Sequence, residues 1–382
     1  MRITASIIVF ATICICNAVT VVEGASSIRS FGSTSSSNES SPEMFLDVQL
    51  PQKNAFRQEG LDIEELARWK DDRKITAFGS YKKPVPGNYR EQAFIQCALD
   101  IDKNQNELEV LLALRSKLNG DSQQATNPRR HVVRLLHNFT HMYNNVRYIC
   151  LVLSDGGPTL LAEYAPNYIA PKIRKLTAML KQVVSSVASL HRNGLVHLNI
   201  SPSNILVDYE ADQRAPIATI RSFAYARWLD VDAYEGKLPS IMVGGDFLAK
   251  PPEYFSAGIV DGKAYDAWSI GATFYKACYG WYPFENEYMK LLKTGQTSRY
   301  PGMIARLTPD SIQQLLYPRT RLSTVSHKVI PSEFTAILEQ LLHPDPEKRR
   351  TPEEIVANLN KAQAKPSIRA RFIPSLSSSS SH

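Results

Sequence analysis

Apolar residues recur every three or four positions over the second half of the chain, which is the spacing of one face of an α-helix. The longest such pattern covers 173–190 and stops before Asn193 and Gly194, a pair typical of a helix C-terminus. The same spacing predicts helices over 106–118, 265–279 and 333–342. A last helix is expected to begin at Thr351 and Pro352, with the threonine as N-cap and the proline in the first turn.

The first third of the chain has short apolar runs, which are typical of buried β-strands. Such runs cover 94–99 and 148–153. The segment 61–70 has apolar residues at positions 61, 63, 66 and 69 with charged residues between them, and this spacing predicts a short helix. A strand-rich first third before a helical remainder predicts an α+β fold with two lobes, a small strand-rich N-lobe and a larger helical C-lobe.

The two ends of the chain differ from the region between them. Residues 1–24 combine a basic start, an apolar run and small residues, as a secretory signal peptide does. Serine-rich segments at 25–44 and 366–382 have too few apolar residues to fold, and we expect both to be disordered. The region 45–365 contains no linker or repeat and is expected to form one domain. No stretch after the signal is suited to cross a bilayer, so an exported, soluble protein is expected.

The composition excludes several classes of protein. The 382 residues are 43% hydrophobic and 21% charged, with a formal net charge of +7. Basic residues are scattered and do not alternate with aromatic ones, so no nucleic-acid partner is expected. Cys97, Cys150 and Cys278 remain after the signal and allow one disulfide at most; buried free thiols are favoured. Clustered His and Cys are missing, and no metal site is expected.

Six short motifs follow one another along the chain. They are His197-Leu198-Asn199-Ile200-Ser201-Pro202-Ser203-Asn204, Ser222-Phe223-Ala224, Pro251-Pro252-Glu253, Asp266-Ala267-Trp268-Ser269-Ile270-Gly271, Tyr282-Pro283-Phe284 and Asp345-Pro346-Glu347-Lys348-Arg349. In this order and at these separations they resemble the catalytic loop, the metal-binding segment and the later structural motifs of protein kinases. The resemblance covers about 94–359 and implies the bilobal kinase fold.

The positions that would carry phosphoryl transfer hold unsuitable residues. Transfer needs a lysine on the phosphates, a base for the hydroxyl proton and a carboxylate for the metal. The resemblance places Asp100, Asn199 and Ser222 at these three positions. A carboxylate repels phosphate, an amide accepts no proton near neutral pH, and a hydroxyl is a poor ligand for Mg²⁺. No glycine-rich loop precedes the strand at 94–99. We therefore expect a pseudokinase that binds neither ATP nor Mg²⁺ and has no cofactor.

The positions with structural roles in the family are retained. The resemblance implies that His197 packs within the catalytic loop and that Asp266 accepts backbone hydrogen bonds beneath it. It also implies that Glu253 pairs with Arg349. Asn204 stands where active kinases hold a second metal, and we expect it to brace the loop instead.

Glu107 matches the helix glutamate that pairs with the family's catalytic lysine. With Asp100 opposite, we expect Glu107 to face solvent or to bind another cation, such as Lys103. A displaced lysine from elsewhere could replace the missing one, which would leave a residual atypical kinase.

Three Asn-x-Ser/Thr sequons begin at Asn38, Asn138 and Asn199. The third lies inside the catalytic loop and is expected to be buried and unmodified. The first two are candidate N-glycosylation sites on an exported chain.

The secretory leader, the missing glycine-rich loop and the extra sequence before a compact N-lobe together resemble one branch of the family. This is the glycine-loop-lacking branch of the secreted rhoptry-type kinases of coccidian parasites. The resemblance implies release from dense granules or rhoptries into the parasitophorous vacuole or the cyst wall. The expected function is protein binding, as a scaffold or allosteric partner of another secreted protein. The alternatives are a residual kinase and a structural component of an extracellular matrix.

Overall fold

The computed structural model describes residues 53–68, 74–82, 90–99, 101–118, 131–143, 145–154, 159–162, 170–208, 216–229, 236–256, 258–317 and 330–364. All described residues lie in one unit, Lys53–His382. The segments expected to be a signal peptide, a disordered leader and a disordered tail therefore lie outside the described residues.

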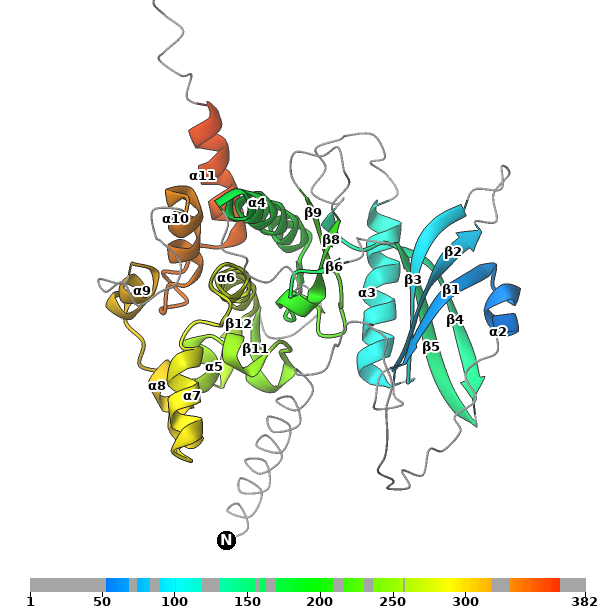
Figure 1. Ribbon diagram of the computed structural model, residues 1–382, viewed down its shortest axis with the longest axis horizontal. Coiled ribbons are helices and arrows are strands. Elements are labelled where there is room, and N and C mark those ends of the chain that lie inside the picture. Colours follow the sequence, from blue (N-terminus) through cyan, green and yellow to red (C-terminus); the bar gives the residue numbers. More distant parts are fainter. Residues whose placement is uncertain are drawn as a thin grey trace, which may run out of the picture. The chain divides into compact units, whose positions relative to one another are not determined.

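The first part of the described chain is a five-stranded antiparallel sheet in the order β1-β2-β3-β5-β4 (Figure 1). Its strands are β1 (Leu61–Arg68), β2 (Lys74–Lys82), β3 (Arg90–Leu99), β4 (Leu135–Tyr143) and β5 (Val146–Ser154). The strands predicted at 94–99 and 148–153 are confirmed as parts of β3 and β5. Alternation along β3 gives the sheet two buried faces.

One face of the sheet packs on α3 (Asp102–Leu118), the helix predicted at 106–118. There Phe94 of β3 belongs to one apolar cluster with Val110 and Leu111 of α3. On the other face, Ile95 and Cys97 cluster with Phe56 of α2 (Lys53–Gln58). Burial of this apolar area is what holds the helices on the sheet.

The segment 61–70 corrects our prediction of a helix, because most of it is strand β1. A β-bulge between Ile63 and Glu65 inserts one additional residue opposite β2. Residues on the same face of β1 are therefore two positions apart before the bulge and three positions apart across it. The pairing with β2 shows this spacing: Leu61, Ile63 and Leu66 lie opposite Tyr81, Gly79 and Ala77, respectively. A bulged strand thus imitates helical spacing.

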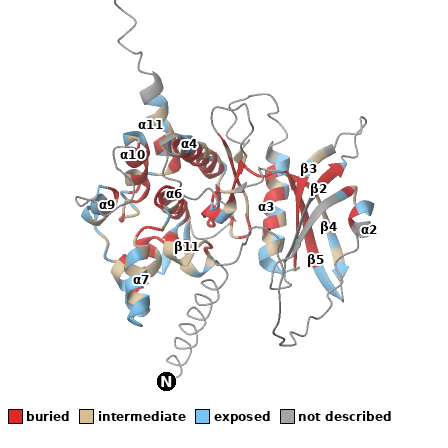
Figure 2. Ribbon diagram, in the orientation of Figure 1, coloured by how far each residue is buried: buried red, intermediate tan, exposed pale blue. Residues whose placement is uncertain are grey.

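The second part is mainly helical. The predicted helices are confirmed as α4 (Ala170–Arg192), α6 (Gly262–Tyr279), α10 (Ser332–Leu341) and α11 (Pro352–Ala364). In α6 every residue except Lys263 and Lys276 is buried, and α4 and α10 pack against it (Figures 1 and 2). The same apolar cluster contains Val183 and Val184 of α4 and Phe334 of α10, so it forms the main core of this part.

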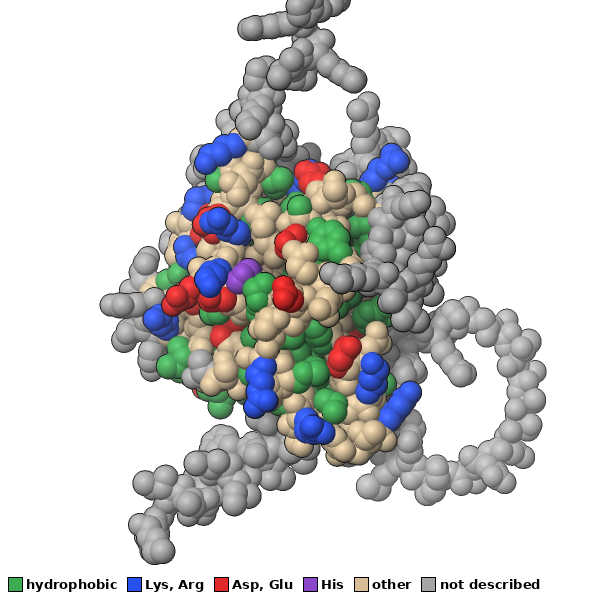
Figure 3. Space-filling model, turned by 90° about the vertical axis from the view of Figure 1, so that its left-hand side faces the viewer, with side chains coloured by type: hydrophobic (Ala, Val, Ile, Leu, Met, Phe, Trp, Pro, Cys, Tyr) green, Lys and Arg blue, Asp and Glu red, His purple; other side chains and the backbone are tan. Residues whose placement is uncertain are grey.

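Shorter elements connect these helices. They are β6 (Thr159–Leu160), β7 (Leu195–Val196), the 3₁₀ turn η2 (Pro202–Asn204), β8 (Ile205–Asp208), β9 (Ile217–Ile220), β10 (Arg227–Trp228), β11 (Lys237–Pro239), η3 (Ser240–Met242), η4 (Phe247–Ala249), α5 (Pro252–Ser256), β12 (Ile259–Asp261), α7 (Glu285–Lys293), η5 (Thr297–Arg299), α8 (Tyr300–Ile304) and α9 (Pro309–Leu316). Small sheets pair β6 with β8 and β9, β7 with β10, and β11 with β12. On the face shown in Figure 3, Lys and Arg side chains are interspersed with Asp and Glu.

The helix boundaries follow local signals in the sequence. Before α11, Thr351 Oγ1 accepts a hydrogen bond from the Glu354 N–H (3.3 Å). The Glu354 carboxylate in turn accepts one from the Thr351 N–H (2.9 Å), which completes a capping box. Gly194 follows α4 with φ +76°, a left-handed conformation that favours glycine at a helix end.

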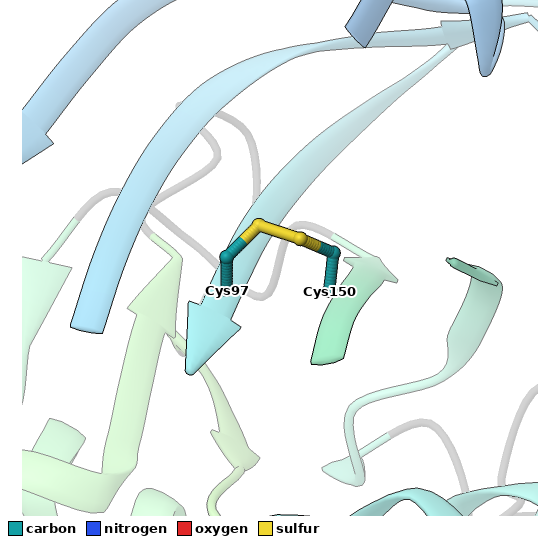
Figure 4. The surroundings of a disulfide bond; sticks show 2 residues. All are labelled: Cys97 and Cys150. Carbon is teal, nitrogen blue, oxygen red and sulfur yellow. A yellow bond between two sulfur atoms is a disulfide. The ribbon is translucent and has the colours of Figure 1, made fainter. Parts of the chain in front are cut away.

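Cys97 and Cys150 form a disulfide, so the expectation of three buried free thiols is wrong for these two (Figure 4). They lie directly opposite each other on β3 and β5, with their Cα atoms 4.0 Å apart. Such close opposition on neighbouring strands brings two side chains within bonding reach. Cys278 is free and buried in α6.

The sheet with α2 and α3, followed by the helical part, confirms the predicted α+β bilobal fold. Among the described helices, none combines the length and apolar character that a membrane span requires.

Candidate functional site

The catalytic-loop motif begins directly after β7, ends with η2 and is held by α6. Asp266 accepts hydrogen bonds from the backbone N–H groups of His197 and Leu198, both at 2.7 Å. The His197 ring packs edge-on against Phe223, with centroids 4.7 Å apart, and one ring nitrogen lies 3.2 Å from the Arg221 carbonyl. Burial lowers the pKa of His197, so this ring is neutral and serves as packing. The loop is thus fixed by an anion in α6.

A second histidine, His191, links Asp266 to Glu353 of α11. The buried His191 ring lies 2.9 Å from Asp266 Oδ2 and 3.2 Å from Glu353 Oε2, and Lys263 Nζ lies 3.0 Å from Glu353 Oε1. Burial alone would lower the pKa of His191, but the hydrogen bonds and charges of Asp266 and Glu353 outweigh it and raise this pKa. Burial likewise opposes ionisation of Glu353, yet His191 and Lys263 lower its pKa to about 2. The four groups form a chain of alternating charges that runs from the buried Asp266 and His191 to the partly exposed Glu353 and Lys263.

A buried ion pair joins the motif at Glu253 to the one at Arg349. The guanidinium donates to both carboxylate oxygens, at 2.6 and 2.9 Å. It also donates to the carbonyls of Ala264 (2.9 Å) and His343 (2.8 Å) and lies 5.0 Å from the centre of the Trp268 ring. The arginine side chain has no exposed area, so the pair is well satisfied in a dry environment.

Asn199 and Ser222, which the family resemblance assigns to the base and metal-ligand positions, contact each other directly. The Asn199 amide donates to Ser222 Oγ (3.0 Å), and its Oδ1 accepts from the Gly245 N–H (2.9 Å). Asn204 donates from its amide to the Asn199 carbonyl (2.8 Å), so it braces the loop. Ser222 has φ +71°, which is rare outside glycine and is maintained here by its surroundings. The site is a closed network of neutral groups.

Glu107 corrects our expectation, because it neither faces solvent nor binds Lys103. Its side chain lies under the sheet, and the residue is 2% exposed. One carboxylate oxygen accepts from the Phe223 N–H (2.9 Å) and the other from the Gln96 amide (3.3 Å). Lys103 instead donates to the Tyr225 hydroxyl (2.8 Å) and lies 4.0 Å from the centre of its ring.

The residue of β3 that meets Glu107 is therefore Gln96. Asp100, which we assigned to the lysine position, follows the end of β3 and lies outside the described residues. We had aligned the family's lysine motif with the last residues of β3, which put the lysine position at Asp100. The alternation of side chains along β3 was the signal that we missed. Only residues an even number of positions from Phe94, such as Gln96, can point toward α3.

Helix α3 holds the segment after Ser222 by a row of side chains. Lys103, Asn106 and Glu107 are spaced i, i+3 and i+4, so they share one helix face. Besides the contacts of Lys103 and Glu107, the Asn106 amide lies 3.1 Å from the carbonyls of both Ala224 and Ala226. The side chains of α3 thus fix the backbone of this segment.

The segment at 243–250 closes over the same loop. Gly244 donates from its N–H to the Leu198 carbonyl (2.8 Å). A Cβ at Gly244 would lie 2.5 Å from the Tyr225 ring and 2.8 Å from Asn199 Oδ1, so only glycine fits there. Lys250 is buried and donates to the Gly244 carbonyl and to the Tyr265 hydroxyl (3.0 Å). Burial lowers the pKa of Lys250 to about 7, with Asp246 opposing that change.

These features are those of a protein kinase, and comparison with known families agrees. The model of the protein kinase domain matches residues 122–359, more than half of the chain. The chain belongs to the protein kinase family.

Three relatives give the range of similarity. Human serine/threonine-protein kinase ULK1 is 26% identical over 228 residues, which cover 58% of this chain and 20% of the relative. Mitogen-activated protein kinase kinase kinase 3 of Arabidopsis thaliana is 25% identical over 310 residues, 71% of this chain and 44% of the relative. The probable serine/threonine-protein kinase fhkA of Dictyostelium discoideum is 25% identical over 196 residues, 46% and 30%. The chain spans less than half the length of each.

Proposed function

We propose that this chain is a pseudokinase, a kinase fold without phosphotransfer activity, and that it acts as a protein-binding scaffold or allosteric partner. The observation that carries the proposal is the direct hydrogen bond between Asn199 and Ser222, 3.0 Å long. Phosphoryl transfer needs anionic oxygens at these positions, to hold Mg²⁺ and to accept a proton.

The amide of Asn199 is engaged by the protein itself. Its nitrogen donates to Ser222 and its oxygen accepts from Gly245, so both functional atoms have protein partners. A hydroxyl and an amide that satisfy each other provide no charge to a metal ion. We infer that the site is complete without a ligand.

Two further features would oppose the binding of nucleotide phosphates. We assign the position of the family's lysine to Gln96, whose amide carries no charge to attract phosphate. The connection between β1 and β2, from position 69 to 73, contains no glycine, and its two acidic residues, Asp71 and Asp72, are balanced by Lys70 and Arg73. A glycine-rich turn brings backbone N–H groups to the phosphates, and this connection has no glycine with which to do so.

The retained buried charges support a role for the fold itself. Asp266 and the pair Glu253–Arg349 are fully hydrogen-bonded, so the framework around the inactive site is rigid and specific. Protein recognition requires a surface that keeps its shape, and it requires no catalytic activity. The relatives are named as serine/threonine kinases, but their names do not establish kinase activity for this chain.

We further propose that the chain belongs to the glycine-loop-lacking branch of secreted coccidian rhoptry-type kinases, among which it most resembles the bradyzoite pseudokinase of Toxoplasma. Its place would then be the parasitophorous vacuole or cyst wall, after release from dense granules or rhoptries, with another secreted protein as partner. The disulfide between Cys97 and Cys150 supports export, because such bonds persist in oxidising compartments.

The test is a phosphotransfer assay with the purified chain, ATP, Mg²⁺ or Mn²⁺ and a general protein substrate. We expect no transfer above the blank from the wild type or from Asn204→Ala. Transfer that Asn204→Ala abolishes would instead establish a residual kinase. A parallel pull-down compares the wild type with Asn199→Asp: equal recovery of secreted partners supports a scaffold, because the chemistry of the site would be irrelevant.

A further inference from the structure

Strand β4 carries one of the three sequons on an open edge of the sheet. β4 ends the strand order, and none of the described strands pairs with its outer side. Its sequon is Asn138-Phe139-Thr140. The Phe139 ring packs inward, with its centroid 6.1 Å from that of Phe56. Because side chains alternate along a strand, Asn138 and Thr140 lie on the opposite face.

That opposite face is the one that packs on α3, and on β4 its exposed part begins at Thr140. Thr140 is exposed, and Met142, two residues further along the same face, is 60% exposed. Asn138 is half-buried, and no hydrogen bond joins its side-chain amide to another residue in the described part of the chain. Both residues that a glycosylating enzyme recognises are therefore presented without disturbing the core.

The sequon at Asn199 gives the opposite result. Asn199 is buried, its amide nitrogen donates to Ser222, and its Oδ1 accepts from Gly245. A glycan there would displace both partners and the segment at Gly244. The sequon at Asn38 lies outside the described residues.

The neighbouring disulfide indicates where this sheet folds. Phe139 is paired across the sheet with Cys150, which is bonded to Cys97. Disulfides form in the oxidising compartments of the secretory pathway, where N-glycans are also attached. The sequon and the disulfide thus point to the same compartment from independent chemistry.

We propose that Asn138 carries an N-linked glycan and that this glycan covers the open edge of the sheet. The amide nitrogen bonds to the anomeric carbon of an oligosaccharide donated by a lipid-linked diphosphate. The bond from that carbon to the diphosphate breaks, the diphosphate leaves with the electron pair, and the nitrogen loses one proton.

The structure provides a reason for such a modification. An exposed edge strand is a template for pairing with another chain, and β4 is nine residues long. Apolar side chains at its hairpin end, Met142 and Val146, are 60% and 41% exposed. A bulky hydrated group at Asn138 prevents a second strand from approaching.

The experiment expresses the full chain through a eukaryotic secretory pathway and treats the secreted protein with a peptide N-glycanase in ¹⁸O water. Mass spectrometry of the tryptic peptide covering 135–147 then detects conversion of Asn138 to labelled aspartate. We expect Asn138 to be modified and Asn199 to be unmodified. An unmodified Asn138 in the secreted, folded protein overturns the proposal.

A matched pair of variants separates the glycan from the side chain that directs it. Thr140→Ser keeps the sequon and Thr140→Ala removes it, at an exposed position. Complete loss of the modification in Thr140→Ala alone, with increased self-association in gel filtration, supports both parts of the proposal. Equal self-association of the two variants would overturn the role of the glycan at the sheet edge.

Discussion

Asp266 and Asn199 contact the same short loop, and the protein treats the two positions in opposite ways. Asp266 is a buried anion that receives two backbone N–H groups and a histidine. Asn199 is a neutral amide that receives one backbone N–H and donates to a hydroxyl. The carboxylate is retained where it holds the chain together. An amide stands instead at the position that, under our proposal, corresponds to the catalytic base of an active kinase.

The electrostatics explain why this difference is stable. A buried charge is tolerated when it is paired and hydrogen-bonded, as Asp266 is. Carboxylates at both 199 and 222 would lie about as close as the present 3.0 Å contact and would repel each other without a cation between them. An amide and a hydroxyl remove that repulsion. Under our proposal, the neutral side chains therefore stabilise this site without a metal ion.

The largest expected effect is on the structural framework. Arg349→Met leaves Glu253 buried without its partner, and we expect a loss of about 3–5 kcal/mol in the free energy of unfolding. Arg350→Met is the matched control, because its pair with Glu354 is exposed and is worth at most about 0.5 kcal/mol. Denaturation by urea measures both. Similar losses in the two variants would show that the buried pair has no special role.

The disulfide provides the next test, on the sheet. Cys97→Ala combined with Cys150→Ala removes a cross-link between residues 53 positions apart, and we expect a loss of about 2–4 kcal/mol. Cys278→Ala is the control, since that thiol is free. Urea denaturation of the oxidised proteins gives the difference. An unchanged midpoint in the double variant would mean that the bond does not stabilise the sheet.

Reciprocal exchanges of acid and amide test the comparison itself. Asp266→Asn replaces an acceptor by a donor facing backbone N–H groups and should cost about 1.5–3 kcal/mol. Asn199→Asp keeps an acceptor for Gly245 and for the Ser222 hydroxyl but buries a charge and loses the donor to the Ser222 carbonyl, so we expect a smaller loss, of about 1 kcal/mol. Urea denaturation gives both values. The reverse order would contradict our account of the two positions.

The smallest effect is a dependence on pH that originates at His191. Its pKa is raised above the ordinary 6.5, so its stabilising contribution is complete below about pH 6.5 and is lost as the pH rises through the raised value. For Glu353, with a pKa near 2 in place of 4.5, the contribution is complete above pH 4.5 and is lost toward pH 2. The ion pair is therefore strongest between these limits.

The measurement is the melting temperature from pH 5 to 9 for the wild type and for His191→Gln. Lys250 binds its proton less tightly than in the unfolded chain, so its effect on stability has the opposite sign above pH 7. The relevant quantity is thus the difference between the two proteins, which we expect to shrink with rising pH. A difference that does not vary with pH would mean that His191 does not change its protonation state between pH 5 and 9.

Much of the helical part could be predicted from sequence, because its signals are local. The apolar period over 173–190 and the Thr351 cap each require only neighbouring residues. The strand β1 could not be predicted this way, since a bulge changed the phase of its apolar residues. Register also decides the disulfide, because only pairing of β3 with β5 brings Cys97 opposite Cys150.

The candidate site was predictable in its residues but not in its contacts. Motif order located Asn199 and Ser222, yet their hydrogen bond joins residues 23 positions apart. The environment of Glu107 was missed for the same reason. Its partner Gln96 depends on which side of β3 faces α3, and that is a property of the assembled sheet.

Thermal unfolding of the full chain with and without millimolar ATP plus Mg²⁺ or Mn²⁺ tests the central claim most directly. A ligand at about 100 times its Kd stabilises the native state by about 2.7 kcal/mol, which moves the midpoint by roughly 2–4 °C. We predict no shift with any combination of nucleotide and metal, because the site is closed by its own neutral groups. A metal-dependent shift of several degrees would contradict that account and would establish a nucleotide site in this fold.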